Sequence, residues 1–530
     1  MILVKRSCVV VEPYEWDYCE VLQYWFSIFD ISTHSYSYKG MYYDAEKKRL
    51  FLPRGIDIRK VERVLRERAV ISKEYDEYES TGKMMIKYLP KNETQKEAIR
   101  FILGLSEYSY TVPYSQLSVN LMTGKGKTYI AIASLAYLES RFIMITVLTS
   151  WIAQWKDKIL EYTDLKKKDI KVLTATDMAR IYNGNLDPMK YKVFLTGHSA
   201  IHSFANKFGW ESVGIVFKKL KIQVKVFDEN HLNFDNCCMI DFYTNTYKTL
   251  YLTATPRRSD PKENRIFKMY FEQVPNIELF NKEEDAKVKC VCIHFTSHPT
   301  PMVVGRCRFK YGLNKVEYMK WLQSRETYWK MIYVIFCEAI LNMVGSCLLL
   351  VEYNNWIPMV KEWIEMNFPE FIGRIGTFHG DTPENEREIA KQQKIIITNR
   401  MCGGTCMDSN LINIVFPLAA PVKSDVIAQQ MFGRTGREGM EFPNMLYIDL
   451  VDEGFKKLKE FYANRNKVFM KYATECSDIV YRDMDIEARY QKYKRLRSIP
   501  PWSIKIPAKV EPVECPWRIN LGDDKDATDK

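Results

Sequence analysis

Glycine and proline are scarce in this 530-residue chain, which has 23 of one and 21 of the other. This scarcity excludes collagen-like and low-complexity proteins. A content of 46% apolar and 27% charged residues also excludes a wholly disordered chain. At roughly 150 residues per domain, the length predicts about three or four domains.

The chain also lacks any Cys-x-x-Cys pair, although it has 13 cysteines. The number is odd, the cysteines are scattered, and we expect Cys290 and Cys292 to lie on opposite faces of a strand. This pattern favours reduced thiols in a cytosol-like compartment over a disulfide framework or a zinc site.

No export signal is recognisable, because the apolar residues 1–4 precede the first basic residues, the reverse of a signal peptide. Residues 331–351 contain Glu338 as their only formal charge, but Asn342 and Gly345 interrupt the run. We therefore expect a buried helix followed by a strand, and no membrane span. The predicted location is cytoplasmic, or the host cytoplasm if the source is a virus.

Charge of neither sign dominates: 77 Lys and Arg residues face 66 Asp and Glu residues, for a net charge of +11. Such a surplus fits a polyanionic partner, and it fits an ordinary soluble protein equally well. Charge alone does not identify the function.

Short apolar runs alternate with helical stretches in two series, which predicts two tandem α/β lobes with parallel sheets. The expected strands cover residues 118–122, 142–148, 170–173, 193–196, 222–227 and 249–252, then 288–295, 347–351, 374–378, 394–398, 412–416 and 445–450. Ahead of them, residues 2–11 are expected to form one strand and residues 36–52 a hairpin. The predicted domains are a small α/β domain (1–78), lobe 1 (79–285), lobe 2 (286–455) and a helical basic extension with a tail (456–530).

Residues 121–128 read Leu-Met-Thr-Gly-Lys-Gly-Lys-Thr and join an expected strand to a helix. A glycine-rich turn at a helix N-terminus presents backbone N–H groups to phosphates, while Lys127 can reach the β and γ phosphates and Thr128 can hold Mg²⁺. Leu121 replaces the first glycine of the usual G-x-x-x-x-G-K-[ST] string. The strand-loop-helix context still favours a nucleotide site over a chance Gly-Lys turn.

The strand expected at 222–227 ends in Asp228-Glu229-Asn230-His231. Phosphoryl transfer can use Asp228 to hold the metal and Glu229 to orient the attacking water. An isolated acidic pair would more often cap the next helix. Together with the phosphate-binding turn, the catalytic interpretation is favoured.

Residues 430–437 read Gln-Met-Phe-Gly-Arg-Thr-Gly-Arg in the second series. Arg434 and Arg437 can bring cations to a γ-phosphate held by the other lobe. Alone, the string could be a basic surface turn; as the third motif in order, it predicts a two-lobed ATPase.

These motifs, spread over roughly residues 87–455, resemble those of superfamily 2 helicases and translocases of the DExH type, in which ATP binds between two RecA-like lobes. The resemblance implies ATP, Mg²⁺ and a nucleic acid as ligands. The implied catalytic residues are Lys127, Asp228, Glu229, Gln430, Arg434 and Arg437, with Thr128 and Asp228 on the metal. The implied nucleotide contacts are Gln95, Thr123, Gly124, Lys125, Gly126, Lys127, Thr128 and Asp408, and the residues implied to couple hydrolysis to lobe movement are His231, Thr253 and Thr255.

Nucleic-acid contacts are implied at strand-end loops, where short hydroxyls and free N–H groups suit phosphate oxygens. They are Thr149, Ser150, Thr196, His198, His379, Gly404 and Thr405. For His198, a loop histidine without such a contact is an equal alternative. The basic and aromatic run 490–497 could bind nucleic acid or form a solvated helix.

The small front domain and compact core are most similar to phage branched-DNA helicases of the UvsW type. The predicted function is an ATP-dependent DNA helicase or translocase that remodels branched DNA in recombination, repair or replication. DEAD-box RNA helicases fit less well, because His231 stands where they have Asp. The alternatives are an RNA helicase, the motor subunit of a restriction-modification system, and a nucleotide-dependent scaffold.

Overall fold

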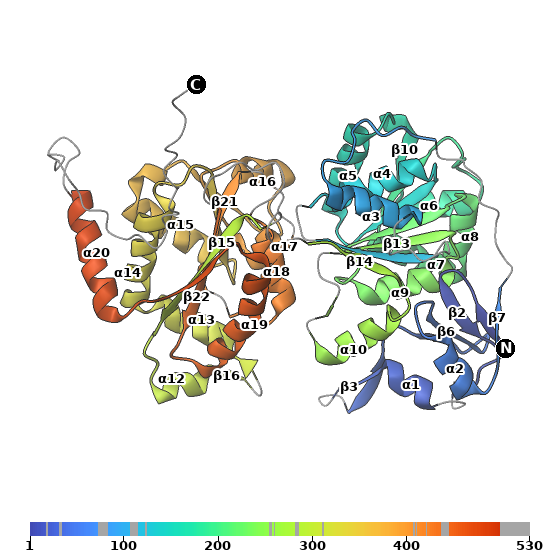
Figure 1. Cartoon of the computed structure of the whole chain (residues 1–530), viewed down its shortest axis with the longest axis horizontal. Helices are drawn as coiled ribbons and strands as arrows, with labels where there is room; N and C mark the ends of the chain where they lie inside the picture. The colour runs from blue at the N-terminus through green and yellow to red at the C-terminus, as the bar shows by residue number, and fades with distance from the viewer. Residues whose placement is uncertain are drawn as a thin grey trace, which may run out of the picture. The chain divides into compact units, whose positions relative to one another are not determined.

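The computed structural model divides the chain into two compact units, Met1–Phe280 and Asn281–Lys530 (Figure 1). It describes residues 1–16, 20–30, 34–72, 83–105, 115–121, 125–253, 257–258, 260–280, 286–309, 312–405, 409, 411–419, 421–435 and 445–498. The charged segment at residues 72–83, whose composition predicts a linker, lies almost wholly outside these residues. The domain limits predicted at residues 78 and 455 remain predictions.

Lobe 1 is built on a seven-stranded sheet in the order β10-β11-β9-β12-β13-β8-β14. Its strands are β8 (Gln116–Asn120), β9 (Phe142–Thr146), β10 (Ile170–Val172), β11 (Val193–Gly197), β12 (Val224–Asp228), β13 (Lys248–Thr253) and β14 (Asn276–Glu278). Its helices are α3 (Glu93–Leu103), α4 (Lys127–Tyr137), α5 (Thr149–Tyr162), α6 (Ala175–Tyr182), α7 (His198–Phe208), α8 (Trp210–Lys219), α9 (Phe234–Tyr243) and α10 (Pro261–Tyr270).

Every strand pair of this sheet is parallel. Strand β9 has the burial typical of such a sheet: all its side chains are buried, because helices cover both faces of a parallel sheet. The six strands predicted for lobe 1 are confirmed, with ends shifted by a few residues, and β14 is an additional edge strand. Parallel strands joined by helices have their carboxyl ends at one edge of the sheet.

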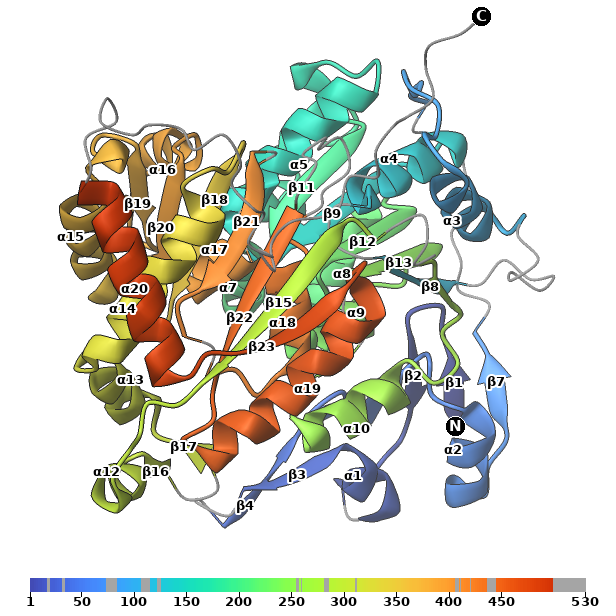
Figure 2. The ribbon, with the colours of Figure 1, turned by 60° about the vertical axis from the view of Figure 1, so that its left-hand side comes forward.

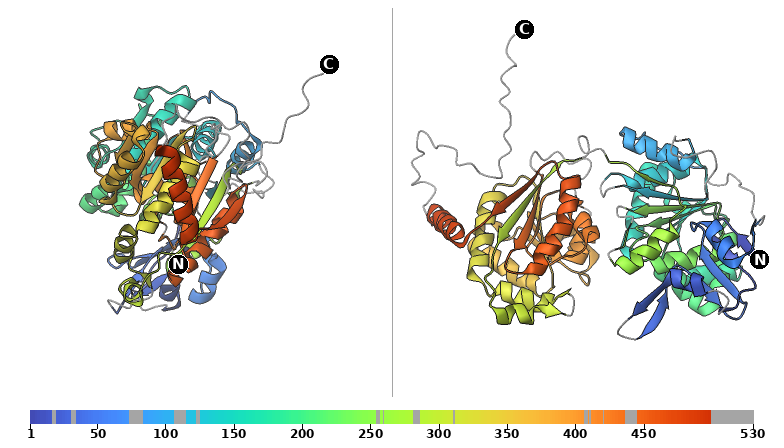
Figure 3. Two further views of the ribbon diagram at one scale, coloured as in Figure 1. Left: turned by 90° about the vertical axis from the view of Figure 1, so that its left-hand side faces the viewer. Right: turned by 60° about the horizontal axis from the view of Figure 1, so that its bottom comes forward.

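The N-terminal segment forms a five-stranded sheet in the order β5-β6-β2-β1-β7. Its elements are β1 (Ile2–Val4), β2 (Cys8–Val11), α1 (Glu20–Phe26), β5 (Tyr42–Asp44), β6 (Arg49–Pro53), α2 (Ile58–Leu65) and β7 (Ala69–Ile71). A separate pair, β3 (Ser27–Asp30) and β4 (Ser35–Tyr38), extends from this segment (Figure 3, right).

One expectation for this segment is wrong. The single strand predicted over residues 2–11 is an antiparallel hairpin, because the chain turns where the amide of Lys5 donates to the carbonyl of Cys8 at 2.9 Å. The hairpin predicted at residues 36–52 is confirmed for β5 and β6, whereas residues 35–38 form β4 and pair with β3.

The N-terminal sheet packs directly onto lobe 1 and shares its hydrophobic core. The rings of Phe51 and Tyr243 lie 5.0 Å apart, and the amide of Arg6 donates to Asn245 Oδ1 at 2.9 Å. Gly55 lies so close to α10 that a Cβ there would be 2.2 Å from the carbonyl oxygen of Tyr270. Only glycine fits such an approach, so the front segment and lobe 1 form one unit.

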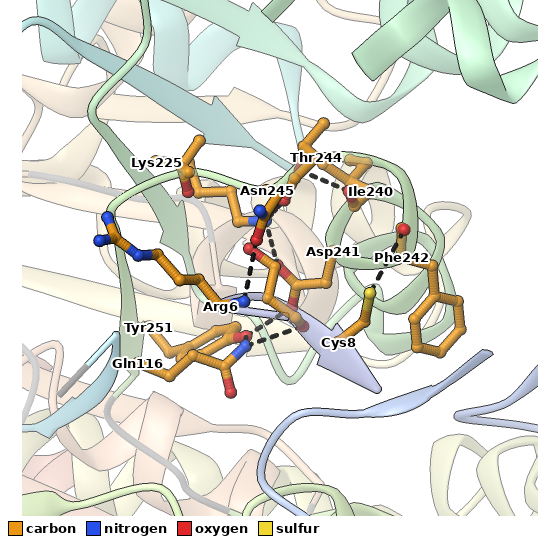
Figure 4. Close-up of polar contacts among 12 residues, drawn as sticks. Arg6, Cys8, Gln116, Lys225, Ile240, Asp241, Phe242, Thr244, Asn245 and Tyr251 are labelled. Atoms are coloured by element: carbon orange, nitrogen blue, oxygen red, sulfur yellow. Dashed lines mark hydrogen bonds and ion pairs between the residues drawn. The ribbon is translucent and has the colours of Figure 1, made fainter. Parts of the chain in front are cut away.

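A buried ion pair lies beneath the N-terminal sheet (Figure 4). Lys225 Nζ on β12 is 2.6 Å from Asp241 Oδ1 on α9, and both side chains are 0% exposed. The ammonium also donates to Ser7 Oγ at 3.1 Å, and the other carboxylate oxygen accepts from Tyr270 OH at 2.6 Å. Since burial lowers the pKa of Lys225 while Asp241 raises it, the charged form depends on this partner.

Lobe 2, like lobe 1, is built on a sheet of seven parallel strands, in the order β19-β20-β18-β21-β22-β15-β23. They are β15 (Val288–Phe295), β18 (Ser346–Val351), β19 (Ile375–Phe378), β20 (Ile395–Asn399), β21 (Ile412–Pro417), β22 (Met445–Asp452) and β23 (Cys476–Val480). Around them lie α12 (Pro301–Arg306), α13 (Lys315–Gln323), α14 (Glu326–Ile335), α15 (Trp356–Asn367), α16 (Glu384–Lys391), α17 (Arg400–Thr405), α18 (Asp425–Phe432), α19 (Lys456–Tyr472) and α20 (Asp483–Ser498). A short hairpin joins β16 (Arg308–Phe309) to β17 (Gly312–Leu313). The six predicted strands are confirmed, and the two lobes have the tandem RecA-like architecture expected; β23 was missed.

The expectation that Cys290 and Cys292 lie on opposite faces of a strand is wrong. Side chains two residues apart on a strand point to the same face. Both thiols lie on one face of β15, with their Sγ atoms 3.8 Å apart.

The C-terminal helix α20 lies beside α14 (Figure 2). Glu338, the lone charge of the run 331–351, accepts hydrogen bonds from Tyr481 OH at 2.9 Å, Arg489 Nη1 at 2.9 Å and Tyr493 OH at 3.1 Å. The ring of Tyr490 lies 5.1 Å from that of Tyr333. Because these aromatic side chains hold α20 against lobe 2, the structure favours a docked helix over a base-stacking role for them.

The run at residues 331–351 folds as expected into buried helix followed by strand. α14 continues into η3 (Phe336–Ile340), and β18 follows. Within the described part of the chain, no helix combines the length and apolarity that a membrane crossing needs.

Candidate nucleotide site

Three neighbouring strands of lobe 1 carry the predicted nucleotide motifs at their carboxyl ends. β8 leads into the phosphate-binding turn, β12 ends at Asp228 and β13 ends at Thr253. Gly126 caps α4 in the left-handed conformation, with φ +80° and no side-chain cap, so the N-terminal amides can meet an anion. Thr123, Gly124 and Thr255 lie outside the described residues.

Lys127 and Glu229 form an ion pair in this site. Lys127 Nζ lies 2.7 Å from Glu229 Oε1, and the two side chains are 11% and 18% exposed. Glu229 has a φ of +48°, which is unusual for a residue other than glycine. Strained backbone of this kind is common where a structure must aim a functional group.

Asp228 lies next to this pair and accepts a hydrogen bond from Trp155 Nε1 at 2.8 Å. Burial and the neighbouring charge of Glu229 raise the pKa of Asp228 to about 6. Two adjacent carboxylates are stabilised by a divalent cation, so this donor set, with the Thr128 hydroxyl at the start of α4, fits Mg²⁺. Trp155 was not predicted as a site residue, although the sequence places it nearly two helix turns after the start of α5 at Thr149.

His231 connects the acidic motif to the end of β13. Its Nδ1 lies 2.8 Å from Thr253 Oγ1 and 3.3 Å from Glu229 Oε2. Burial lowers the pKa of His231 to about 4, so the ring is neutral at pH 7. The structure thus brings together two of the three residues predicted to couple hydrolysis to movement.

Arg258 supports this loop and was missed by the sequence analysis. Its guanidinium donates to the carbonyl of His231 and pairs with Glu263, with Nη2 2.8 Å from Oε2. Only the tertiary fold reveals the contact, because 27 residues separate Arg258 from His231.

Gln95, predicted to contact adenine, lies in the first turn of α3 and is 2% exposed. Its Oε1 accepts from the amide of Lys91 at 3.0 Å. The side chain orders the loop ahead of α3, and its contact with adenine remains a prediction.

The predicted nucleic-acid contacts of lobe 1 divide into exposed and buried side chains. Thr149 is exposed at the start of α5, whereas the side chain of Ser150 lies outside the described part. Thr196 is 0% exposed and donates to the carbonyl of Leu173 at 3.0 Å, and His198 is 1% exposed. Burial prevents these last two side chains from touching a phosphate in this conformation, which argues against their predicted role.

In lobe 2, Gln430 lies in α18 and Arg434 just beyond it, both largely buried. Arg437 and Asp408 lie outside the described residues. Gly404 and Thr405 form the end of α17, and the surroundings of these two residues are outside the described part. His379 follows β19 and is partly exposed, with Nδ1 3.6 Å from Asp381 Oδ2.

Gly403 sets how closely α17 approaches the sheet. A Cβ at this position would lie 2.5 Å from both Leu350 Cδ2 and Thr398 Cγ2. We expect Gly403→Ala to lower the free energy of unfolding by about 1–3 kcal/mol, because overpacking displaces the helix or its neighbours. Hydrogen exchange of the α17 amides measures the effect.

The control for this variant is Gly305→Ala in α12, where an added Cβ meets no atom within 4 Å. It should leave stability unchanged or slightly raised, since alanine favours helix. Equal protection of α17 in Gly403→Ala and the parent chain would contradict the packing argument.

Comparison with known proteins gives one family match and several similar folds. Residues 89–258 match the family described as "Type III restriction enzyme, res subunit". No curated protein matches the chain in sequence.

Among solved structures, the chain is similar to the ATP-dependent Type ISP restriction-modification enzyme LlaBIII bound to DNA, with 13% identity and a TM-score of 0.51 over 77% of this chain and 32% of that one. S. cerevisiae Dbp5 bound to RNA and ADP BeF3 has 14% identity and a TM-score of 0.49, covering 77% and 94%. T4 UvsW has 15% identity and a TM-score of 0.35, covering 91% and 99%.

Proposed function

We propose that this chain, an ATP-hydrolysing enzyme of the superfamily 2 helicase type, is a DNA helicase or translocase that remodels branched or forked duplexes. The observation that carries the proposal is the cluster of Lys127, Asp228 and Glu229 at the carboxyl edge of a RecA-like sheet. Such an edge is where open parallel sheets bind ligands, and these groups serve phosphoryl transfer.

In this proposal, the amides at the start of α4 and the ammonium of Lys127 bind the ATP phosphates. Thr128 and Asp228 hold Mg²⁺, which neutralises developing charge on the phosphates when bound. Glu229 accepts a proton from the attacking water and orients it. Phosphate binding has to draw the Lys127 ammonium from its present partner Glu229, which frees that carboxylate for the water.

Movement would follow from the contact between His231 and Thr253. A shift of Glu229 on hydrolysis reaches His231 directly, since 3.3 Å separates them, and passes to the end of β13. We propose that Arg434 and Arg437 of lobe 2 supply positive charge to the same γ-phosphate, so that hydrolysis weakens the attraction between lobes.

DNA is favoured over RNA by two observations. The acidic motif ends in His231, unlike that of DEAD-box RNA helicases, and the matched family is named for a restriction enzyme subunit, a class that acts on DNA. The net charge of +11 suits either nucleic acid. Action in phage recombination or repair rests on the sequence resemblance to helicases of the UvsW type.

The second candidate is the motor subunit of a restriction-modification system, favoured by the same family match over residues 89–258. Such a motor translocates along duplex DNA without needing a branch. It therefore predicts ATPase stimulation by linear duplex and no strand separation.

The deciding experiment compares DNA and RNA of equal length and sequence as ATPase stimulators, then forked, four-way and blunt duplexes in strand displacement. We expect stimulation by DNA and displacement of forked and four-way substrates. Stimulation by RNA alone would overturn the DNA assignment, and stimulation by blunt duplex without displacement would favour the restriction motor.

A further inference from the structure

Three cysteines from two distant parts of the sequence meet on one face of the lobe 2 sheet. Cys290 and Cys292 come from β15 and Cys476 from the edge strand β23, where it is the direct partner of Cys290. All three Sγ atoms lie within 4.8 Å of one another, and two of the thiols are buried while Cys476 is partly exposed. No other group of three or more potential ligands occurs among the described residues.

The spacing suits a shared metal ion. Thiolates bind Zn²⁺ at about 2.3 Å in a tetrahedral arrangement, which places neighbouring sulfurs about 3.8 Å apart. The Sγ atoms of Cys290 and Cys292 are separated by 3.8 Å. Coordination would therefore require little movement of this pair, and Cys476 faces the same point from the neighbouring strand.

The groups around the triad are engaged elsewhere. Asp449, beside Cys292 on β22, is held by Arg465 of α19, with Nη2 2.7 Å from Oδ2. His294 lies between Glu453 and Asp478, at 2.7 and 2.9 Å. The Cys476 thiol itself donates to Asn466 Oδ1 at 3.7 Å, and coordination would replace that contact. A site built from sulfur alone selects soft ions with filled d shells.

We propose that Cys290, Cys292 and Cys476 bind one thiophilic ion of the Cu⁺ or Zn²⁺ class, which fastens β23 to the sheet of lobe 2. Coordination replaces the three thiol protons, which leave to solvent. Copper(I) needs only the three sulfurs, whereas zinc would add a water on the partly exposed side of Cys476.

The location gives the ion a structural role that is independent of ATP chemistry. β23 is an edge strand, paired with β15 alone, so the ion would fasten this edge of the sheet in addition to the backbone ladder. Burial holds the pKa of the Cys290 thiol well above its usual value, so this thiol stays neutral until an ion displaces its proton.

The test titrates the reduced, metal-free full chain with Zn²⁺ and, separately and without oxygen, with Cu⁺, each against a competing chelator. We expect one ion per chain and a higher Tm when loaded, because a ligand that binds only the folded state stabilises it. Cobalt(II) loading should add a thiolate charge-transfer band. Failure of the parent chain to bind either ion would overturn the proposal.

Cys476→Ser should weaken binding by about a hundredfold or more, because removing even a residue that merely supports a metal ligand weakens a site by about 10–100-fold. The matched control is Cys402→Ser, which removes another partly buried thiol of the same lobe. Unchanged affinity in Cys476→Ser, or equal loss in both variants, would also overturn the proposal.

Alkylation of the parent chain with iodoacetamide, read by mass spectrometry, tests the site without any substitution. Cys290 and Cys292 are buried with or without an ion, so the readout is the partly exposed Cys476, whose alkylation the bound ion should slow. Equal alkylation of Cys476 with and without the ion would overturn the proposal.

Discussion

Lys127→Ala abolishes nucleic-acid-stimulated ATP hydrolysis, with turnover expected to fall by at least about a hundredfold. The ammonium is the cation placed nearest the acidic pair, 2.7 Å from Glu229, and it is largely shielded from water. Loss of one such preorganised charge typically costs about 10²–10³ in turnover. Phosphate release in the presence and absence of DNA measures the effect.

Glu229→Gln separates binding from chemistry. The amide retains the shape of the side chain but cannot accept a proton from water, so ATP should bind and not be hydrolysed. Lys158→Ala removes an exposed lysine whose contacts, with Glu161 and the ring of Tyr162, lie within α5. It serves as the control and should leave turnover unchanged. Normal turnover by Lys127→Ala would contradict the nucleotide site itself.

Lys225→Met lowers the free energy of unfolding of lobe 1 by about 3–5 kcal/mol, because it leaves the carboxylate of Asp241 buried without its partner. The loss includes the contact with Ser7, so the N-terminal sheet should loosen with lobe 1. Urea unfolding followed by hydrogen exchange of peptides from β2, β12 and α9 measures both effects.

A double variant and a surface control test this explanation. Lys225→Met with Asp241→Leu removes both charges and should recover part of the loss, since an apolar pair can replace a buried ion pair. Lys39→Ala breaks partly exposed pairs with Asp235 and Glu263 and should cost at most about 1 kcal/mol for each pair. A cost for Lys225→Met no larger than that of Lys39→Ala would contradict the argument.

The strands and the ATP motifs were predictable because each is encoded by one continuous stretch of sequence. The runs that became β9 and β18 are apolar apart from one terminal hydroxyl residue each, as a strand covered on both faces requires. β15 is also mainly apolar, and its two polar residues, Lys289 and His294, are only partly buried. The order of the three motifs also predicted tandem lobes. The turn between β1 and β2 was not predicted, because the apolar residues before and after it resemble a single continuous strand.

The nucleic-acid contacts were less predictable for a physical reason. A motif places a residue at a strand end, but whether its side chain meets solvent depends on the elements packed above it. Thr196 ends the expected strand and His198 follows it closely, yet both are buried, whereas Thr149 is exposed. The tyrosines of α20 give a similar example. Their alternation with basic residues allows a base-stacking role, yet in the structure Tyr493 donates a hydrogen bond to Glu338.

By itself, the sequence determined the α/β class, the two parallel sheets and the residues of the phosphate-binding and acidic motifs, because periodicity and local motifs encode them. Only the tertiary structure decided that Trp155 holds Asp228, that Arg258 supports His231, and that Lys225 joins the N-terminal sheet to lobe 1. It also decided that Cys476 meets Cys290 and Cys292. These contacts join side chains from separate elements, and their proximity arises from packing, which no single stretch of sequence specifies.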